Sequence, residues 1–289
     1  MAFAKRKISL QFMLGQGDFG ESGSDTVTLD GLRCSANIVY GGSISARAEL
    51  QIYGMKLDVM RQLTVLQTFF WNNYRNNTVT VLAGDKPDAM SQCFSGDIFE
   101  AWVEAKSPPD VSFYVSAITQ NHSLKKAVPA ISFKGNVDAG TVAEIIAQQM
   151  EYTLENSGVN AQLNNPYFPG SVQNQLDALC RAAGCQYYLD ENRRILAIWP
   201  LNGNRVIPPV TVSAKTGLVG YPSFTQGGIR FTTLYNPLLT FGAPIIMQSQ
   251  LAPANGRWAV YQLAHRIESN VPGGQWYSDV ECTYMDHQA

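Results

Sequence analysis

The chain has little charge and few of the residues that build active sites or metal centres. Only 15% of its 289 residues are Asp, Glu, Lys or Arg, against roughly 25% in an ordinary soluble protein. It has three histidines and five cysteines, without C-x-x-C or His-x-x-x-His spacing. These shortages predict no metal site, no cofactor and no disulfide framework. We expect the cysteines to be buried and reduced.

Long hydrophobic runs and an excess of positive charge are also missing. No stretch of 18 apolar residues occurs, so the sequence predicts no membrane span and no membrane anchor. The net charge is −2, so the chain has no excess of positive charge with which to bind nucleic acid. Polar uncharged residues take the place of charge, as expected of a surface that partner proteins cover; compositional drift is the alternative.

The first residues, MAFAKRKISLQFML, resemble a signal peptide in their basic residues and short apolar stretch. However, Ile8, Leu10, Phe12 and Leu14 occupy alternate positions, which is typical of a strand, and no small-residue cleavage site follows. We therefore expect a first β-strand, and a protein that is made and kept in the cytoplasm.

Residues 1–121 are predicted to form an antiparallel β-barrel or sandwich that carries one helix. Apolar residues alternate on both sides of Gly41-Gly42, a dipeptide typical of a hairpin turn. The helix is predicted from the three- and four-residue spacing of Val59, Leu63, Leu66 and Phe70. The predicted strands cover residues 32–40, 44–52, 79–82, 94–103 and 111–117.

Residues 122–201 are predicted to form a small α+β unit. Its first helix, Thr141–Met150, has two candidate N-caps: Thr141, with Glu144 at capping-box spacing, or Asp138. A second helix is predicted at about Ser171–Ala183, between an N-cap at Ser171 and a stop at Gly184. The stretch QYYLDENRRILAIWP is predicted to be a hairpin that turns at Asp190–Asn192.

Residues 202–289 are predicted to be all strand, and a faint internal repeat relates them to the first segment. Gly31-Leu32 precedes Gly41-Gly42 by ten residues, and Gly217-Leu218 precedes Gly227-Gly228 by the same ten. The repeat suggests two related barrels that flank the α+β unit. A chance match in a glycine-rich chain is the alternative.

The block HRIESNVPGGQWYSDVECTYM, residues 265–285, is predicted to be a hairpin with one buried face. His265 shares a face with Leu263 and Ile267, so we expect a hydrogen-bonded, half-buried, structural imidazole. A Ser-His-Asp triad is the alternative, although no G-x-S-x-G elbow supports it. Trp276 is expected to fill the core, and a sugar-binding face is the alternative.

Candidate catalytic and nucleotide-binding motifs are few. Gly15 to Gly20 match G-x-G-x-x-G, but the residues after them are predicted as loop and strand, whereas a dinucleotide site needs a helix there. A glycine-rich loop is therefore expected. A wall-degrading activity would need paired carboxylates, and we expect no enzymatic activity because the candidates lack any signature. These candidates are Glu100, Glu104 and Asp110, and separately Glu151 and Glu155, one turn apart if the first helix extends that far.

Several blocks, taken in order, resemble phage baseplate hub proteins over nearly the whole chain. ELQIYGMKLDVMRQLTVL and FSGDIFEAWVEAKSPPDVSFYVSA are similar to the first barrel of that family, and VPAISFKGNVDAGTVAEIIAQQM through QYYLDENRRILAIWP to its small α+β domain. The C-terminal barrel is matched at Gly217, Leu218, Gly220, Pro222, Asn236, Pro237, Gly242, His265, Pro272, Gly273, Gly274 and Trp276.

This resemblance implies a mainly β fold, in which two tail-tube-like antiparallel barrels (1–121 and 202–289) flank a small α+β domain (122–201). It implies a structural homotrimer, a pseudo-sixfold ring that joins the hexameric tail tube to the trimeric spike. The implied partners are the tail tube protein, the spike or tip protein and, in addition, baseplate wedge and tape-measure proteins, with DNA only in transit. The implied location is the virion tail, after assembly in the host cytoplasm. A wall-degrading enzyme or a carbohydrate-binding tail module is the alternative.

Overall fold

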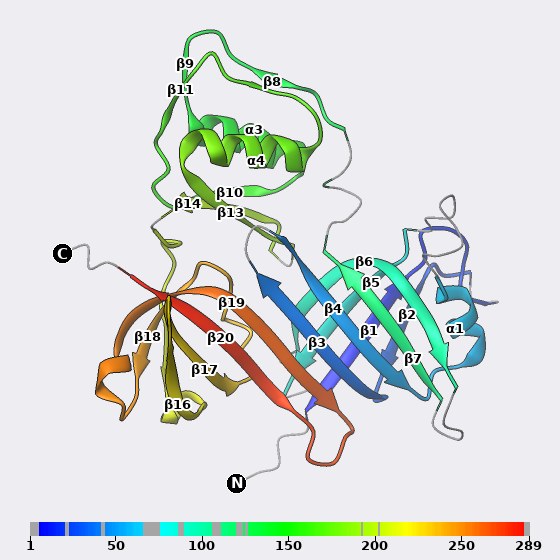
Figure 1. The fold of residues 1–289 in the computed structure, drawn as a ribbon. Coiled ribbons are helices and arrows are strands. Elements are labelled where there is room, and N and C mark those ends of the chain that lie inside the picture. Colours follow the sequence, from blue (N-terminus) through cyan, green and yellow to red (C-terminus); the bar gives the residue numbers. More distant parts are fainter. Residues whose placement is uncertain are drawn as a thin grey trace.

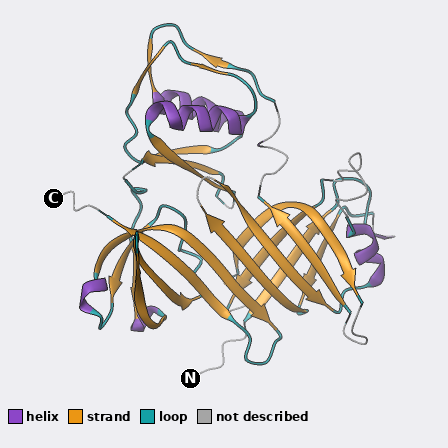
Figure 2. Ribbon diagram, in the orientation of Figure 1, coloured by secondary structure: helices purple, strands orange, loops and turns teal. Residues whose placement is uncertain are grey.

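The computed structural model describes most of the chain. The described residues are 6–20, 23–41, 44–65, 76–85, 90–105, 111–119, 124, 127–191, 193–201 and 203–285. The fold is mainly β with an α+β insertion, as the sequence predicted, and Figures 1 and 2 show the insertion on one side of the long strands.

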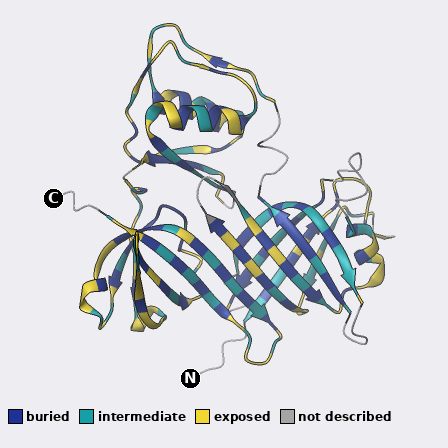
Figure 3. Cartoon of the chain, in the orientation of Figure 1, coloured by how far each residue is buried: buried dark blue, intermediate teal, exposed yellow. Residues whose placement is uncertain are grey.

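In its described residues, the first segment is a row of seven antiparallel strands with one short α-helix. The strands pair in the order β3-β4-β7-β6-β5-β1-β2. Their apolar residues alternate inward, and Figure 3 shows this as bands of buried and exposed positions along each strand. The elements are β1 (Lys7–Met13), β2 (Thr26–Asp30), β3 (Arg33–Gly41), β4 (Ile44–Tyr53), α1 (Leu57–Leu63), β5 (Thr78–Gly84), β6 (Ser91–Glu104) and β7 (Ser112–Ile118).

The third segment contains six strands and two short 3-10 helices. Its strands pair antiparallel, except for one parallel pair, β15 with β18. The elements are β15 (Val210–Ser213), η2 (Ala214–Thr216), β16 (Leu218–Thr225), β17 (Gly228–Leu234), β18 (Pro244–Gln248), η3 (Ala252–Ala254), β19 (Gly256–Ser269) and β20 (Trp276–Tyr284).

The long strand β19 joins the first and third segments into one sheet. Gln262 to Ser269 pair antiparallel with β3, while the other edge of β19 pairs with β20. The result is a 13-stranded sheet in which the path of ladders runs from β16 to β2. A single hydrophobic core is shared by both segments. Among the described strands the ladders do not close either segment into a complete barrel.

The middle segment packs two helices over a small three-stranded sheet and has its own hydrophobic core. Figure 1 shows α3 and α4 side by side, with β10, β13 and β14 below them. The elements are β8 (Ile131–Ser132), β9 (Asn136–Asp138), α3 (Ala139–Gln149), β10 (Thr153–Asn156), β11 (Gln162–Asn164), β12 (Tyr167–Phe168), α4 (Val172–Ala183), β13 (Cys185–Asp190) and β14 (Ile195–Pro200).

Local predictions for the helix ends were mostly accurate. Ser171 caps α4 and Gly184 ends it in the left-handed conformation, as predicted. Helix α3 begins two residues earlier than predicted because Asp138, and not Thr141, is the N-cap: its carboxylate accepts the N–H of Gly140 at 2.8 Å. In the first segment α1 ends at Leu63, and the predicted positions Leu66 and Phe70 lie outside the described residues.

The structure also bears on the glycine-rich motif, the cysteines and the predicted absence of a membrane span. The G-x-G-x-x-G match lies in the connection between β1 and β2, and no α-helix follows it among the residues of that connection that are described. All five cysteines are buried free thiols, as expected. Within the part of the chain that is described, no helix is both long and apolar enough to cross a membrane.

Candidate functional site

Tyr235, which directly follows β17, draws together several of the residues singled out from the sequence. Its ring makes edge contacts with His265 at a centroid distance of 5.0 Å and with Trp276 at 5.5 Å. Its N–H donates to the carbonyl oxygen of Trp276 at 3.0 Å. Its phenolic oxygen lies 3.3 Å from the hydroxyl of Ser91 on β6. Tyr235 therefore connects the strands of the third segment to those of the first.

His265 is more deeply buried than the sequence suggested. It is 3% exposed, and its Nδ1 lies 2.9 Å from Oγ of Ser278 on β20. Tyr40 of the first segment packs edge-on against the imidazole at 5.6 Å. Burial lowers the pKa of His265 to about 4, because a charged imidazolium loses its water there, and the negative charge of Asp279 opposes this only in part. The imidazole is therefore neutral at physiological pH.

The contact between His265 and Ser278 does not have the geometry of a catalytic triad. Ser278 is fully buried, and its hydroxyl already accepts the N–H of Asn236 at 3.3 Å. Asp279 lies on the opposite face of β20, where both carboxylate oxygens bind the guanidinium of Arg266. A triad needs the carboxylate on the imidazole and the serine open to substrate. The arrangement is suited instead to holding β19 and β20 together.

Asn236 and Pro237 form the turn that follows Tyr235. The side-chain oxygen of Asn236 accepts the N–H of Leu238 at 3.0 Å, a local bond typical of asparagine in turns. Pro237 lines a cavity of about 290 Å³ at the meeting point of the three segments. The turn thus brings two of the singled-out residues, Asn236 and Pro237, next to His265.

The cavity lined by Pro237 receives side chains from every segment of the chain. Tyr40 and Cys93 come from the first segment, Tyr188 and Asp190 from the middle segment, and His265 from the third. Burial raises the pKa of the Tyr40 phenol well above its usual value, so this phenol stays neutral. The lining mixes polar side chains with leucines, and it also contains the charged residues Asp190 and Arg193.

A buried ion pair lies beside this junction. Nε and Nη2 of Arg205 donate to the two carboxylate oxygens of Glu155, each at 2.8 Å. Nη1 donates to Oγ1 of Thr240 at 3.2 Å, and the guanidinium lies over the Tyr188 ring. The Arg205 side chain is only 1% exposed. Glu155 is on β10 and Thr240 is in the loop before β18, so Arg205, which bonds to both, ties the middle segment to that loop.

Gly242 permits the close packing around Arg205. Its φ of +74° is a left-handed conformation that favours glycine. A Cβ atom there would come within 2.8 Å of the Trp199 ring and 3.1 Å of Cδ of Arg205. This is a physical reason for glycine at a position that the sequence resemblance singled out.

The other singled-out residues lie away from the junction. Gly217 ends η2 with a φ of +108°, and its carbonyl accepts the N–H of Leu234 at 2.8 Å. Leu218 begins β16, and Gly220 lies within the irregular pairing of that strand. Pro222 is a buried position of β16. These residues shape a strand at the end of the sheet.

The turn between β19 and β20 holds Pro272, Gly273 and Gly274. Gly273 has a φ of +68°, which suits a tight turn. The carbonyl oxygen of Gly274 accepts a hydrogen bond from Nη1 of Arg6 at 3.1 Å. The same guanidinium lies over the Trp276 ring, 5.8 Å from its centroid. The turn is therefore joined to the beginning of the first segment.

Trp276 lies in the core, as expected, because only 2% of it is exposed. Its position leaves no ring face available for stacking on a sugar. The alternation along β20 also predicts a buried Tyr284, but this residue is 55% exposed because β20 ends there.

The acidic candidates are not brought together. Glu100 and Glu104 are four positions apart on β6, which puts their backbones roughly 13 Å apart at the usual strand rise. Helix α3 ends at Gln149, so Glu151 and Glu155 are not on one helical turn, contrary to the condition set from the sequence. Asp110, the third candidate from the first segment, lies outside the described residues, as do the two histidines other than His265, which are His122 and His287.

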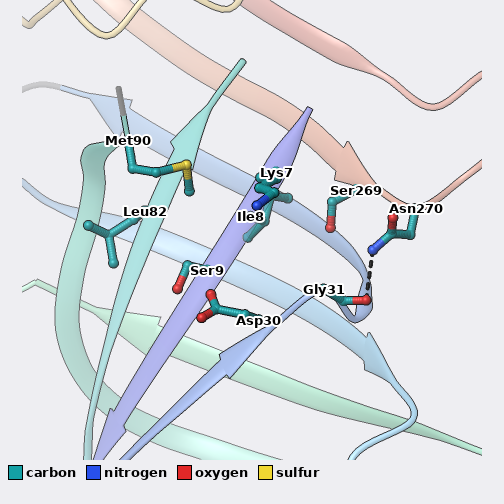
Figure 4. Close-up of a pocket in the computed structure, with 9 residues that line it drawn as sticks. All are labelled: Lys7, Ile8, Ser9, Asp30, Gly31, Leu82, Met90, Ser269 and Asn270. Carbon is teal, nitrogen blue, oxygen red and sulfur yellow. Dashed lines mark hydrogen bonds between the residues drawn. The ribbon is translucent and has the colours of Figure 1, made fainter. Parts of the chain in front are cut away.

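A second cavity, of about 520 Å³, opens where the ends of β1, β2 and β19 approach one another. Figure 4 shows its lining, including Lys7, Ser9 and Asp30. The side chain of Asn270 donates to the carbonyl oxygen of Gly31 at 2.8 Å, drawn as the dashed line in Figure 4. In the described parts of the chain, no group of three potential metal-ligating side chains occurs here or elsewhere.

The sequence did not reveal Tyr235, Glu155 or Arg205 as junction residues. Arg205 stands alone before the apolar residues of VIPPV, and Glu155 occupies an ordinary strand position. Neither residue carries a local signal for an ion pair across 50 positions. Only the approach of the middle segment to the third segment brings them together.

Comparison with known proteins agrees with this architecture. The family model described as baseplate hub gp41 matches residues 13–282. No curated protein sequence matches the chain.

Similar solved structures include tail proteins and a secretion-system component. The tail protein from Neisseria meningitidis MC58 has a TM-score of 0.63 at 10% identity, covering 97% of each chain. The 43 kDa tail protein of prophage MuSo2 from Shewanella oneidensis has a TM-score of 0.62 at 9% identity, covering 98% of each chain. The E. coli c3393 protein, a component of the type VI secretion system, has a TM-score of 0.55 at 11% identity, covering 89% of this chain and 75% of that one.

At these identities the solved structures show that the fold is the one found in phage tail proteins. The match over residues 13–282 shows the family: the chain belongs to the baseplate hub gp41 family, whose members are structural proteins of the tail.

Proposed function

We propose that three copies of this protein form a pseudo-sixfold ring that joins the hexameric tail tube to the trimeric spike. In this role it belongs to the virion tail baseplate, is assembled in the host cytoplasm, and contacts the tube protein, the spike or tip protein, and the wedge and tape-measure proteins. The observation that carries the proposal is the family match over residues 13–282.

The division of the chain supports a ring with two similar positions per copy. Residues 1–121 and 202–289 supply the long strands and share one core, while residues 122–201 form a separate core around α3 and α4. We propose that these three segments are the structural units of the hub. Two strand-rich units in each of three copies would provide six similar positions facing the tube.

Unpaired sheet edges offer a means of joining the copies. Among the described strands, β2 in the first segment and β15 and β16 in the third each pair on one side only. Unpaired edges invite pairing with another chain, and proteins normally protect them. A head-to-tail contact, from the third segment of one copy to the first segment of the next, generates a ring when the rotation closes.

Exposed apolar side chains on β16 favour this assignment of the contact. Val219, Tyr221 and Phe224 are all exposed on this one strand of eight residues. Such a cluster at a strand edge is typical of a surface that a partner covers. The low content of charged residues, 15%, is consistent with a protein most of whose surface lies against other proteins.

The proposed ring leaves a channel through which DNA passes without being held. The net charge of −2 gives the chain no general attraction for phosphates. The proposal is also for a structural and not a catalytic role. The separation of Glu100 from Glu104 on β6 and the buried Ser278 support this, because neither arrangement places reacting groups around an open substrate site.

The oligomeric state tests the proposal. Native mass measurement of the purified chain, alone and mixed with its spike protein, is expected to show trimers. Phe224→Lys should reduce the trimer fraction, because the charge would be buried at the contact. Leu57→Lys, at a similarly exposed position on α1, is the matched control and should leave the trimer intact. A stable monomer under both conditions, or equal behaviour of the two variants, would argue against the ring.

A further inference from the structure

Two cysteines of the middle segment have their sulfur atoms in contact. Sγ of Cys180, in the last turn of α4, lies 3.3 Å from Sγ of Cys185, the first residue of β13. Both residues are buried free thiols. Neither takes part in the junction around His265, and the proposed function gives them no role.

The end of α4 explains why these two side chains meet. Gly184 takes a φ of +64°, and its N–H donates to the carbonyl oxygen of Cys180. This left-handed turn reverses the chain immediately before β13, and a side-chain contact across the end of the helix commonly accompanies such a turn. The helix and the strand are therefore held at a fixed angle, with the two sulfur atoms facing each other.

We propose that Cys180 and Cys185 are a reversible redox pair that closes to a disulfide when the protein meets an oxidant such as a peroxide. A disulfide has a sulfur–sulfur distance of about 2.05 Å, so the atoms need to approach by roughly 1.2 Å. A rotation of the side chains at the end of α4 can supply a movement of this size. The inference goes beyond the proposed function and does not depend on it.

The shared hydrogen bond prepares one of the two thiols for reaction. It lowers the pKa of Cys185, although burial opposes the shift, and it raises the pKa of Cys180. Cys185 therefore ionises first while Cys180 keeps its proton. The thiolate is the reactive form of cysteine, so Cys185 is the attacking sulfur and Cys180 the resolving one.

The reaction balances in two steps with hydrogen peroxide as the oxidant. The Cys185 thiolate attacks one peroxide oxygen, the O–O bond breaks, and a sulfenic acid and hydroxide form. Cys180 sulfur then attacks the sulfur of Cys185, the S–O bond breaks, and the departing hydroxide takes up a proton to form water. The net change is the oxidation of two thiols to one disulfide and the reduction of one peroxide to two waters.

The remaining cysteines are poorly suited to the same chemistry. Burial raises the pKa values of Cys34 and Cys93 to about 12, and it also raises the pKa of Cys282. These thiols stay protonated at neutral pH and are therefore weak nucleophiles. The pair in the middle segment should react first.

Closure would act on the connection between α4 and the β13–β14 hairpin. The hairpin carries Tyr188 and Asp190 to the cavity between the segments. A bond at the end of α4 would fix the base of this hairpin, so the middle segment should unfold at a higher temperature in its oxidised form. In a reducing cytoplasm the same pair would stay open.

The full chain offers a clean assay, because trypsin cleaves after Arg181, between the two cysteines. The purified protein is treated with a small excess of hydrogen peroxide and alkylated in denaturant. We expect a mass decrease of about 2 Da before alkylation, two fewer alkylated thiols, and a disulfide that links the peptide ending at Arg181 to the one starting at Ala182. Dithiothreitol should restore all five thiols.

Matched variants identify the residues responsible. Cys180→Ser and Cys185→Ser should each abolish the crosslinked peptide, while Cys282→Ser should keep it. If a variant fails to fold, the peptide map of the unsubstituted chain still shows whether Cys180 and Cys185 are linked. The proposal is overturned if all five thiols remain after peroxide treatment, or if the lost thiols map to Cys34 and Cys93.

Discussion

Arg205 and Glu155 form a bidentate ion pair in which both nitrogen–oxygen distances are 2.8 Å, although the Arg205 side chain is almost completely buried. We predict that Glu155→Gln lowers the free energy of unfolding by about 3 kcal/mol, because it leaves a buried cation without its counter-charge. Chemical denaturation of the full chain, followed by tryptophan fluorescence, measures the change.

Two further variants separate this effect from ordinary surface electrostatics. Glu49→Gln breaks an ion pair with Arg47 in which both side chains are more than half exposed, and it should cost less than about 1 kcal/mol. The double variant Glu155→Leu with Arg205→Met should be more stable than Glu155→Gln, because no buried charge remains. Equal decreases in the free energy of unfolding for Glu155→Gln and Glu49→Gln would show that the buried pair stabilises the fold no more than the exposed pair does.

The two adjacent glycines of the Gly227-Gly228 turn should respond differently to substitution by alanine. A Cβ atom on Gly228 would lie 2.1 Å from the carbonyl oxygen of Cys282 on β20, whereas one on Gly227 would meet nothing within 4 Å. Gly228→Ala should therefore lower the free energy of unfolding by about 3 kcal/mol or more, because a backbone clash must be relieved. Gly227→Ala should change it by about 1 kcal/mol or less. Thermal unfolding of the two variants measures the difference, and similar melting temperatures would contradict the β17–β20 pairing.

His265 should make the fold sensitive to acid. Its pKa is about 4 in the folded chain, against about 6.5 when unfolded, so between these values the unfolded state binds more protons. Its neutral form thus contributes stability that is complete above pH 6.5 and is lost as the pH falls towards 4, by about 3 kcal/mol in total.

Denaturation curves at intervals between pH 7.5 and 4 would measure this loss. The variant His265→Gln, which can still bond to Ser278, should flatten the dependence over that window. Asp279 is the charged group that acts on the imidazole, so Asp279→Asn should steepen it slightly by removing the opposing effect. An unchanged pH profile in His265→Gln would mean that the imidazole is not the responsible group.

Trp276 should behave as a core residue and not as a ligand-binding one. Trp276→Ala is expected to lower the free energy of unfolding by about 4 kcal/mol, since the ring is buried and packs against Tyr235. Tyr221→Ala, at a position that is 66% exposed, should change the stability of the single chain by about 0.5 kcal/mol or less. A folded Trp276→Ala variant with an unchanged free energy of unfolding would contradict the assignment of Trp276 to the core.

Much of the local structure could be predicted from the chain itself. The alternation along 265–285 predicted the buried face that carries His265 and Trp276, and Ser171 with Gly184 marked the ends of α4. Local sequence does not choose the cap of α3, because Asp138 and Thr141 are both good capping residues and the choice depends on where the preceding strand ends. The burial of His265 was underestimated because Tyr40 and Tyr235, which cover it, come from other strands.

By itself the sequence determined the mainly β character, the α+β insertion and the hub-like order of motifs, because these depend on residues close together in the chain. Only the tertiary structure decided that β19 pairs with β3, so that one sheet and one core span the first and third segments. It also decided that Arg205 meets Glu155, and that Cys180 meets Cys185. The physical reason is that a strand or helix is specified by local periodicity, whereas a strand's partner is specified by which edges meet after the whole chain has packed.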